Sequence, residues 1–238
     1  MKTIITHVFI LLAVSFCSIA VSAAGNNDKK LKIEKPDMDK ICAEVNNPAS
    51  KYYYPKLIAT YEKRDTTMQL EDFRHLYYGY ACQEDYDPYR KSEFSQKVEE
   101  LYQINKHTRA ECDTIIKYAE LSLKDTPFDL QQMNFLIYAL REKKKHHLAN
   151  IWQYKLNHIL EAIVSSGTGL DQENAWHVII PRNEYNIINF MGYKAISQEF
   201  ERPYYDHVFI EKKNDKSPEG YYFNIEYILK EYNRKNPE

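Results

Sequence analysis

The spacing of apolar residues in this 238-residue chain changes near residue 166, and this change constrains the fold more than any other feature. Before it, apolar residues recur every three or four positions between short turns, which predicts amphipathic helices. After it, the short runs AWHVII, YKAIS and DHVFIEKK are β-branched or aromatic and are separated by glycine and proline, which predicts strands. The sequence therefore predicts an α+β fold, with helical hairpins over 28–166 and a small antiparallel sheet with one or two short helices over 171–235, packed on the helices.

The predicted helices form antiparallel pairs of near-equal length. The pairs are 90–105 with 108–124, and 128–144 with 147–166. They begin 38 residues apart, which is within the range of helical-hairpin repeats. We therefore expect a repeat-like helical stack similar to tetratricopeptide repeats, although the consensus of that repeat is not legible in this sequence.

Several residues mark where these helices begin and end. Thr108 and Glu111 have the spacing of a capping box, in which each side chain bonds the backbone of the other. Thr126 and Pro127 are suited to the N-cap and first position of the next helix. Gly167 is expected to end the last helix in a left-handed conformation.

The N-terminus has the pattern of an export signal. Lys2 is followed by the apolar run VFILLAVSFCSIAV and then by the small residues of VSAA, which predicts a signal peptide over 1–23. A membrane anchor is the alternative, but a spanning helix needs about 20 predominantly apolar residues and this run is shorter. We therefore expect an exported protein, periplasmic or secreted, with no transmembrane segment in the mature chain.

Charge and cysteine usage exclude several classes of protein. The formal net charge of −2 does not favour a nucleic-acid partner. Cys42, Cys82 and Cys112 remain after the signal peptide, and their wide spacing excludes a CxxC redox or zinc motif. Their odd number permits one disulfide and one free thiol at most, and favours three small buried apolar residues. Since HExxH, GxSxG and P-loop motifs do not occur, we predict no metal and no cofactor.

The segment 70–89, LEDFRHLYYGYACQEDYDPY, is the strongest candidate for a functional surface. If 70–83 is helical, one arc carries the apolar core side chains, and the opposite arc gathers polar side chains at spacings of three, four and seven. A glycine inside this helix costs about 1 kcal/mol relative to alanine, so either a second helix crosses there or a ligand approaches the backbone. An acidic loop continues this polar side. The candidate binding surface is Glu71, Arg74, His75, Tyr78, Gly79, Glu84, Asp85, Asp87 and Tyr89.

Two interpretations of this segment remain open. Its tyrosines could fill a seam between helices, or they could form a shallow polar and aromatic pocket for a sugar, a peptide or a cationic group. The preferred hypothesis is a non-enzymatic binding or scaffold protein of the cell envelope, whose partner is a protein, peptide or glycan. The alternative is a periplasmic hydrolase that uses Glu71, His75 or the acidic loop as acid and base.

Motifs along the chain resemble one bacterial family. YPKL at 54–57, DTT, the tyrosine-rich segment, SGTG, NEYNII, YYD and YYFNI together are similar to the family called domain of unknown function 4919 (DUF4919). The resemblance covers nearly all of the mature chain. It implies a secreted or periplasmic protein of gut-type Gram-negative bacteria, and it implies no activity.

Overall fold

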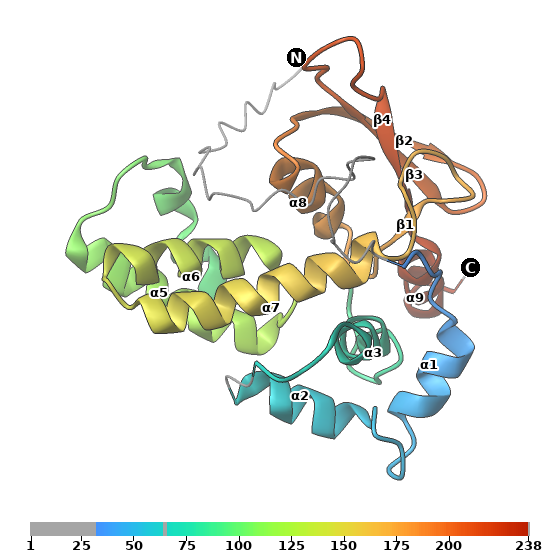
Figure 1. Ribbon diagram of the computed structural model, residues 1–238, viewed down its shortest axis with the longest axis horizontal. Helices are drawn as coiled ribbons and strands as arrows, with labels where there is room; N and C mark the ends of the chain where they lie inside the picture. Colours follow the sequence, from blue (N-terminus) through green and yellow to red (C-terminus); the bar gives the residue numbers. More distant parts are fainter. Residues whose placement is uncertain (1–31, 64–65, 238) are drawn as a thin grey trace.

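The computed structural model describes residues 32–63 and 66–237, so the predicted signal peptide lies outside the described residues. The first part of the chain is helical (Figure 1). Its elements are α1 (Met38–Val45), α2 (Tyr54–Glu62), α3 (Leu70–Tyr80), α4 (Glu93–Gln96), a 3₁₀ helix (Glu99–Gln103), α5 (Arg109–Asp125), α6 (Leu130–Glu142) and α7 (His146–Val164). None of the helices in these described ranges is both long and apolar enough to cross a membrane.

The second part contains strands and two helices, which confirms the predicted α+β class. Its elements are β1 (Trp176–His177), α8 (Arg182–Phe190), β2 (Ala195–Glu201), β3 (Tyr205–Ile210), β4 (Gly220–Asn224) and α9 (Glu226–Lys235). The strand order is β1-β4-β3-β2. β2, β3 and β4 pair antiparallel, but β1 pairs parallel with β4. The sheet is therefore mixed, and the prediction of a purely antiparallel sheet was wrong because the two-residue β1 joins a strand far along the chain.

The predicted helix ends are correct at one position and wrong at two. Thr108 and Glu111 form the capping box at the start of α5. Asp129, not Thr126, caps α6, because the Thr126 hydroxyl already donates to the carbonyl of Ser122 at the end of α5, at 2.9 Å. Gly167 is not left-handed; a Cβ there would lie 2.2 Å from the carbonyl oxygen of Asn174, so glycine is required for close packing.

The repeat-like stack is not confirmed. α5, α6 and α7 pack side by side as consecutive helices, but the predicted helix at 90–105 is only the four-residue α4 and a short 3₁₀ turn. In the 93–103 segment only Val98 is a buried apolar residue. Helices gain most of their stability from packing an apolar face, so this segment has too little burial to hold a continuous helix.

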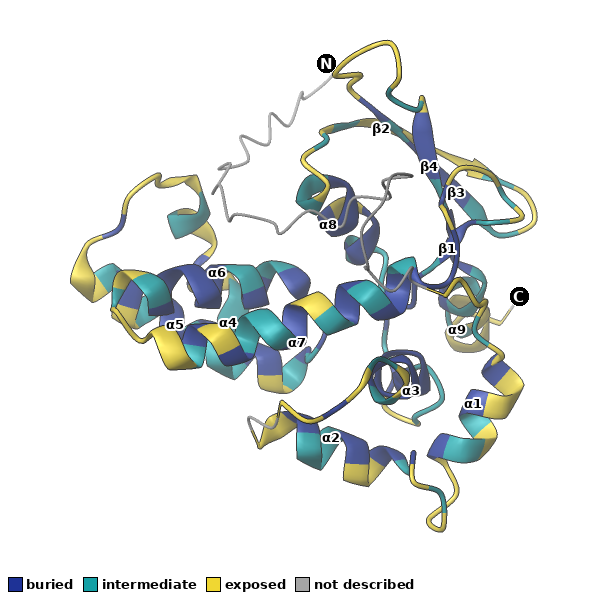
Figure 2. Ribbon diagram, viewed as in Figure 1, coloured by how far each residue is buried: buried dark blue, intermediate teal, exposed yellow. Residues whose placement is uncertain are grey.

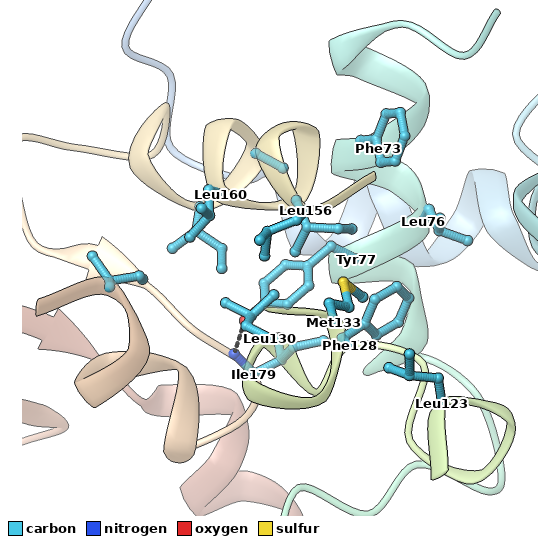
Figure 3. Close-up of a cluster of buried hydrophobic side chains, with 14 of the residues drawn as sticks. Phe73, Leu76, Tyr77, Leu123, Phe128, Leu130, Met133, Leu156, Leu160 and Ile179 are labelled. Atoms are coloured by element: carbon cyan, nitrogen blue, oxygen red, sulfur yellow. Dashed lines mark hydrogen bonds between the residues drawn. The ribbon is translucent and has the colours of Figure 1, made fainter. Parts of the chain in front are cut away.

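α3 lies at the centre of the helical part. It contacts α1, α2 and α7, and Figure 2 shows it buried around almost its whole circumference. Figure 3 shows its Tyr77 ring among Phe128, Leu130, Leu156 and Leu160 from other elements. α8 contacts both α6 and β2 and so lies between the helices and the sheet (Figure 1).

Candidate binding site

Four of the nine residues of the predicted binding surface are buried. They are Arg74, His75, Tyr78 and Gly79. All lie on α3, and α1 and α7 cover the side of this helix that the sequence predicted to face solvent. The Arg74 guanidinium donates to the Ser165 hydroxyl and, at 2.8 Å, to the Glu34 carbonyl. The expected exposure of these four residues was wrong because the tyrosines let α3 pack on both sides, so the polar arc became an interface between helices.

The predicted meeting of Glu71, Arg74 and His75 does occur, with the exposed Glu71 at the edge of this interface. Glu71 Oε2 lies 3.4 Å from Arg74 Nε, and its Oε1 lies 3.3 Å from His75 Nδ1. His75 Nε2 lies 2.7 Å from a carboxylate oxygen of Glu44 on α1. The Tyr52 ring stacks on the imidazole with 3.6 Å between ring centroids. Both ring nitrogens are occupied and one ring face is covered, so His75 is not placed to accept a proton from a substrate.

The backbone around Gly79 explains why glycine occupies this position. A Cβ at Gly79 would lie 2.7 Å from Val45 Cγ1 on α1, so a helix crosses there, one of the two alternatives that the sequence left open. Next to this crossing, Cys42 and Cys82 form a disulfide, while Cys112 is a free buried thiol. The expectation of three unpaired cysteines was therefore wrong, because the crossing of α1 over α3 brings two of them together.

The remaining predicted residues form a surface loop after α3. Glu84 and Asp85 are exposed, and Asp85 lies 3.5 Å from Arg90. Asp87 lies 3.5 Å from Lys235 of α9. The predicted nine residues therefore divide into a buried interface and this acidic loop, which ends at the exposed Tyr89.

A pair of carboxyl groups that the sequence analysis did not single out lies between α8 and the sheet. Glu184 of α8 is 0% exposed and Asp206 of β3 is 8% exposed. Both carboxyls are bonded by the same side chain. The side-chain amide of Gln198 on β2 donates to Glu184 Oε2 at 3.3 Å and to Asp206 Oδ2 at 2.5 Å. The Tyr185 hydroxyl donates in turn to Gln198 Oε1, so the exposed Gln198 side chain covers the pair.

Burial governs the protonation of this pair. It raises the pKa of Glu184 well above its ordinary value, and the neighbouring Asp206 charge raises that pKa further. Burial also raises the pKa of Asp206, while hydrogen bonds from Gln198 and Glu184 act to lower it. Within residues 32–63 and 66–237, no cation forms an ion pair with either carboxyl. Of the two carboxyls, Glu184 is the one whose pKa is raised more strongly.

Four exposed aromatic rings belong to the elements around the pair. We name these four the aromatic rim: Tyr89 (52% exposed), Tyr185 (38%), Phe200 (52%) and Tyr232 (50%). The Tyr89 and Tyr232 rings meet edge to face at 6.4 Å. Burial and the charges of Tyr232, Asp206 and Glu184 raise the pKa of Tyr89, so its hydroxyl is within electrostatic reach of the pair. Phe200 lies directly opposite Asp206 in the β2–β3 register and shares its face of the sheet.

The placement of the two carboxyls differs from that in a glycosidase. Glycosidases place their two carboxyls about 5 Å or more apart so that the scissile bond fits between them, whereas Glu184 and Asp206 are both bonded by the single side-chain nitrogen of Gln198. In the described part of the chain, no three His, Cys, Asp or Glu residues are grouped to hold a metal ion. Exposed rings beside hydrogen-bonding side chains provide contact area and orientation for a ligand.

The sequence did contain a signal for this site. Glu184 precedes Ile187 and Ile188 by three and four residues, so all three share one face of α8, and that face is apolar. An acidic residue on an apolar helix face is expected to be buried with a partner. Glu184 and Asp206 also lie in NEYNII and YYD, two of the motifs on which the family resemblance depends.

The fold and the site define a class of α+β protein in which a helix and a mixed sheet enclose a carboxyl pair beside exposed rings. The model of the family "Domain of unknown function (DUF4919)" matches residues 39–234, so the chain belongs to that family, as its motifs predicted. No curated protein and no solved structure matches it significantly.

Proposed function

We propose that this chain is an exported, non-enzymatic binding protein of the bacterial envelope, periplasmic or secreted, whose ligand contacts the aromatic rim. The observation that carries this proposal is the exposure of four rings, from the loop after α3, α8, β2 and α9, around one buried carboxyl pair. Tyrosine is enriched at binding interfaces because it supplies a large contact area at a low cost in conformational entropy.

Export is supported by two independent features. The predicted signal peptide at 1–23 directs secretion. The Cys42–Cys82 disulfide fits an oxidising compartment, because disulfides persist outside the cytosol and are rare within it.

The ligand class follows from the chemistry of the rim. Its rings offer apolar faces, and the tyrosine hydroxyls and the Gln198 amide offer both donors and acceptors. A peptide or a glycan of the envelope presents the matching combination of apolar faces and hydrogen-bonding groups. Of the nine residues predicted from the sequence, Tyr89 is the one that belongs to this surface.

The hydrolase alternative gains no support from the geometry. His75 is buried, both of its ring nitrogens have partners, and the Tyr52 ring covers one of its faces. A general acid or base must come within hydrogen-bonding reach of the substrate, directly or through one water molecule.

Binding measurements with single-ring variants test the proposal. Peptide and oligosaccharide fractions of the envelope are titrated into the mature chain, 24–238, by calorimetry. We expect Tyr89→Ala and Tyr232→Ala each to weaken binding about tenfold or more, because buried aromatic anchors dominate interface energies. Tyr53→Ala, a half-buried tyrosine on the distant N-cap of α2, is the matched control and should bind as wild type does. Equal binding by all three variants, or breakdown of the bound fraction, would contradict the proposal.

A further inference from the structure

We propose that Glu184 and Asp206 share a single proton in the folded protein, and that this proton holds α8 against the sheet. The proposal concerns the fold itself and does not depend on the function proposed above. It begins from geometry, since one amide nitrogen of Gln198 bridges both carboxyls, at 3.3 Å and 2.5 Å, and so fixes them beside each other.

The charge balance at this position requires a proton. Two carboxylates in contact cannot both ionise without a compensating cation, because their repulsion adds to the cost of burying charge. Among the residues that the structure describes, the Gln198 amide and the other carboxyl are the groups bonded to each member of the pair. Glu184 Oε1 also has no hydrogen-bond donor among the described residues. A proton shared between the carboxyls removes one negative charge and adds a donor to a pair that has only the Gln198 amide as a donor among the described residues.

The groups on the surrounding elements do not compensate the pair. Tyr185 of α8 and Tyr89 of the loop bring neutral hydroxyls, and α9 brings the neutral Tyr232. Asp87 of the loop is 3.5 Å from Lys235 of α9, which lies 3.3 Å from Glu231 on the same helix. Lys235 is thus shared between two other carboxylates. On β2, Phe200 is apolar and Gln198 is uncharged.

The proton makes the stability of the fold depend on pH in a defined direction. Isolated Glu and Asp side chains titrate near pH 4, and the folded pair holds its proton to a higher pH because it is buried. The stabilisation that this proton gives to the folded state is complete below about pH 4. It is lost as the pH rises through the folded pKa of the pair. The contact between α8 and the sheet is therefore expected to weaken as the surroundings become alkaline.

Thermal melts of the mature chain from about pH 5 to about pH 9 test this inference. For a chain of this size, one proton released on unfolding corresponds to a fall in Tm of about 3 °C per pH unit within the titration range of the pair. Glu184→Gln supplies an amide donor in place of the proton. Its Tm should vary less with pH than that of wild type and should exceed it at the alkaline end.

A matched variant and a spectroscopic readout make the outcome decisive. Glu199→Gln removes an exposed carboxylate from β2 and should keep the wild-type profile. The infrared carbonyl band of a protonated carboxyl should be present in wild type at neutral pH and missing in Glu184→Gln. In Asp206→Asn it should persist but shift, because the buried Glu184 loses its carboxyl partner. Parallel Tm profiles for wild type and Glu184→Gln would overturn the proposal. If neither variant folds, the wild-type spectrum decides, since fully ionised carboxyls at neutral pH would also overturn it.

Discussion

Gly79 lies where α1 crosses α3, and Val45 Cγ1 occupies the space in which a side chain would begin, 2.7 Å from an ideal Cβ. Helix propensity alone predicts that Gly79→Leu raises the free energy of unfolding by nearly 1 kcal/mol. Overpacking against Val45, whose χ1 angle is stiff, opposes this gain. We expect a net loss of about 2 kcal/mol, measured by urea denaturation.

The control for this prediction is a double-mutant cycle. Val45→Ala removes the atom that the new side chain meets, so adding it to Gly79→Leu should recover part of the loss. Strictly additive effects, or a Gly79→Leu variant as stable as wild type, would show that the crossing does not constrain this position.

At the scale of single residues, the sequence predicted which side chains meet better than it predicted which are exposed. The spacings of three and four residues placed Glu71, Arg74 and His75 together correctly. They could not reveal that α1 and α7 cover this arc, because a helix with tyrosines on both sides can be buried on both sides. The carboxyl pair was not predicted because it also depends on packing between elements. Glu184 and Asp206 come together only when α8 packs on the sheet.

At the scale of elements, local signals were reliable and long-range pairing was not. The capping box at Thr108 fixed the start of α5 correctly, because both of its side chains bond nearby backbone. The parallel pairing of β1 with β4 has no local signal, since Trp176 meets Phe223 only after the intervening chain has folded. The disulfide belongs to the same class of feature, because it depends on the crossing of α1 over α3.

The disulfide is expected to be a large contributor to the stability of the α1–α3 crossing. Cys42 and Cys82 are separated by 40 residues, and closing a loop of this length stabilises a fold by up to about 4 kcal/mol in the chain-entropy model. We expect Cys42→Ala with Cys82→Ala to lower the free energy of unfolding by about 2–4 kcal/mol in chemical denaturation.

The free thiol provides the comparison for this experiment. Cys112→Ala leaves the disulfide intact, so a reducing agent should still lower the Tm of that variant as it does for wild type. The double alanine variant should not respond to reductant. A wild-type Tm that is the same with and without reductant would contradict the expected contribution.

At the scale of the whole molecule, tyrosines of the 70–89 segment join the helices to the region of the sheet. The Tyr77 hydroxyl donates to Asn183 Oδ1 at 2.8 Å and accepts from the Ile179 amide at 3.2 Å, a bond drawn in Figure 3. The Tyr86 hydroxyl donates to the Ile179 carbonyl at 2.5 Å. Tyr77 and Tyr86 of this segment therefore bond the two parts of the chain to each other.

This bonding predicts that the regions 28–166 and 171–235 unfold together. Calorimetry of the mature chain should show a single transition whose calorimetric and van't Hoff enthalpies agree. Tyr77→Phe leaves Asn183 Oδ1 and the Ile179 amide without this partner in the core, so it should cost about 1–3 kcal/mol and broaden the transition. Tyr61→Phe removes a hydroxyl that donates to the Pro127 carbonyl within the helical part, so it should lower stability without broadening. Two separate transitions in wild type would mean that the tyrosine hydroxyls do not couple the two regions, because coupled regions melt as one unit.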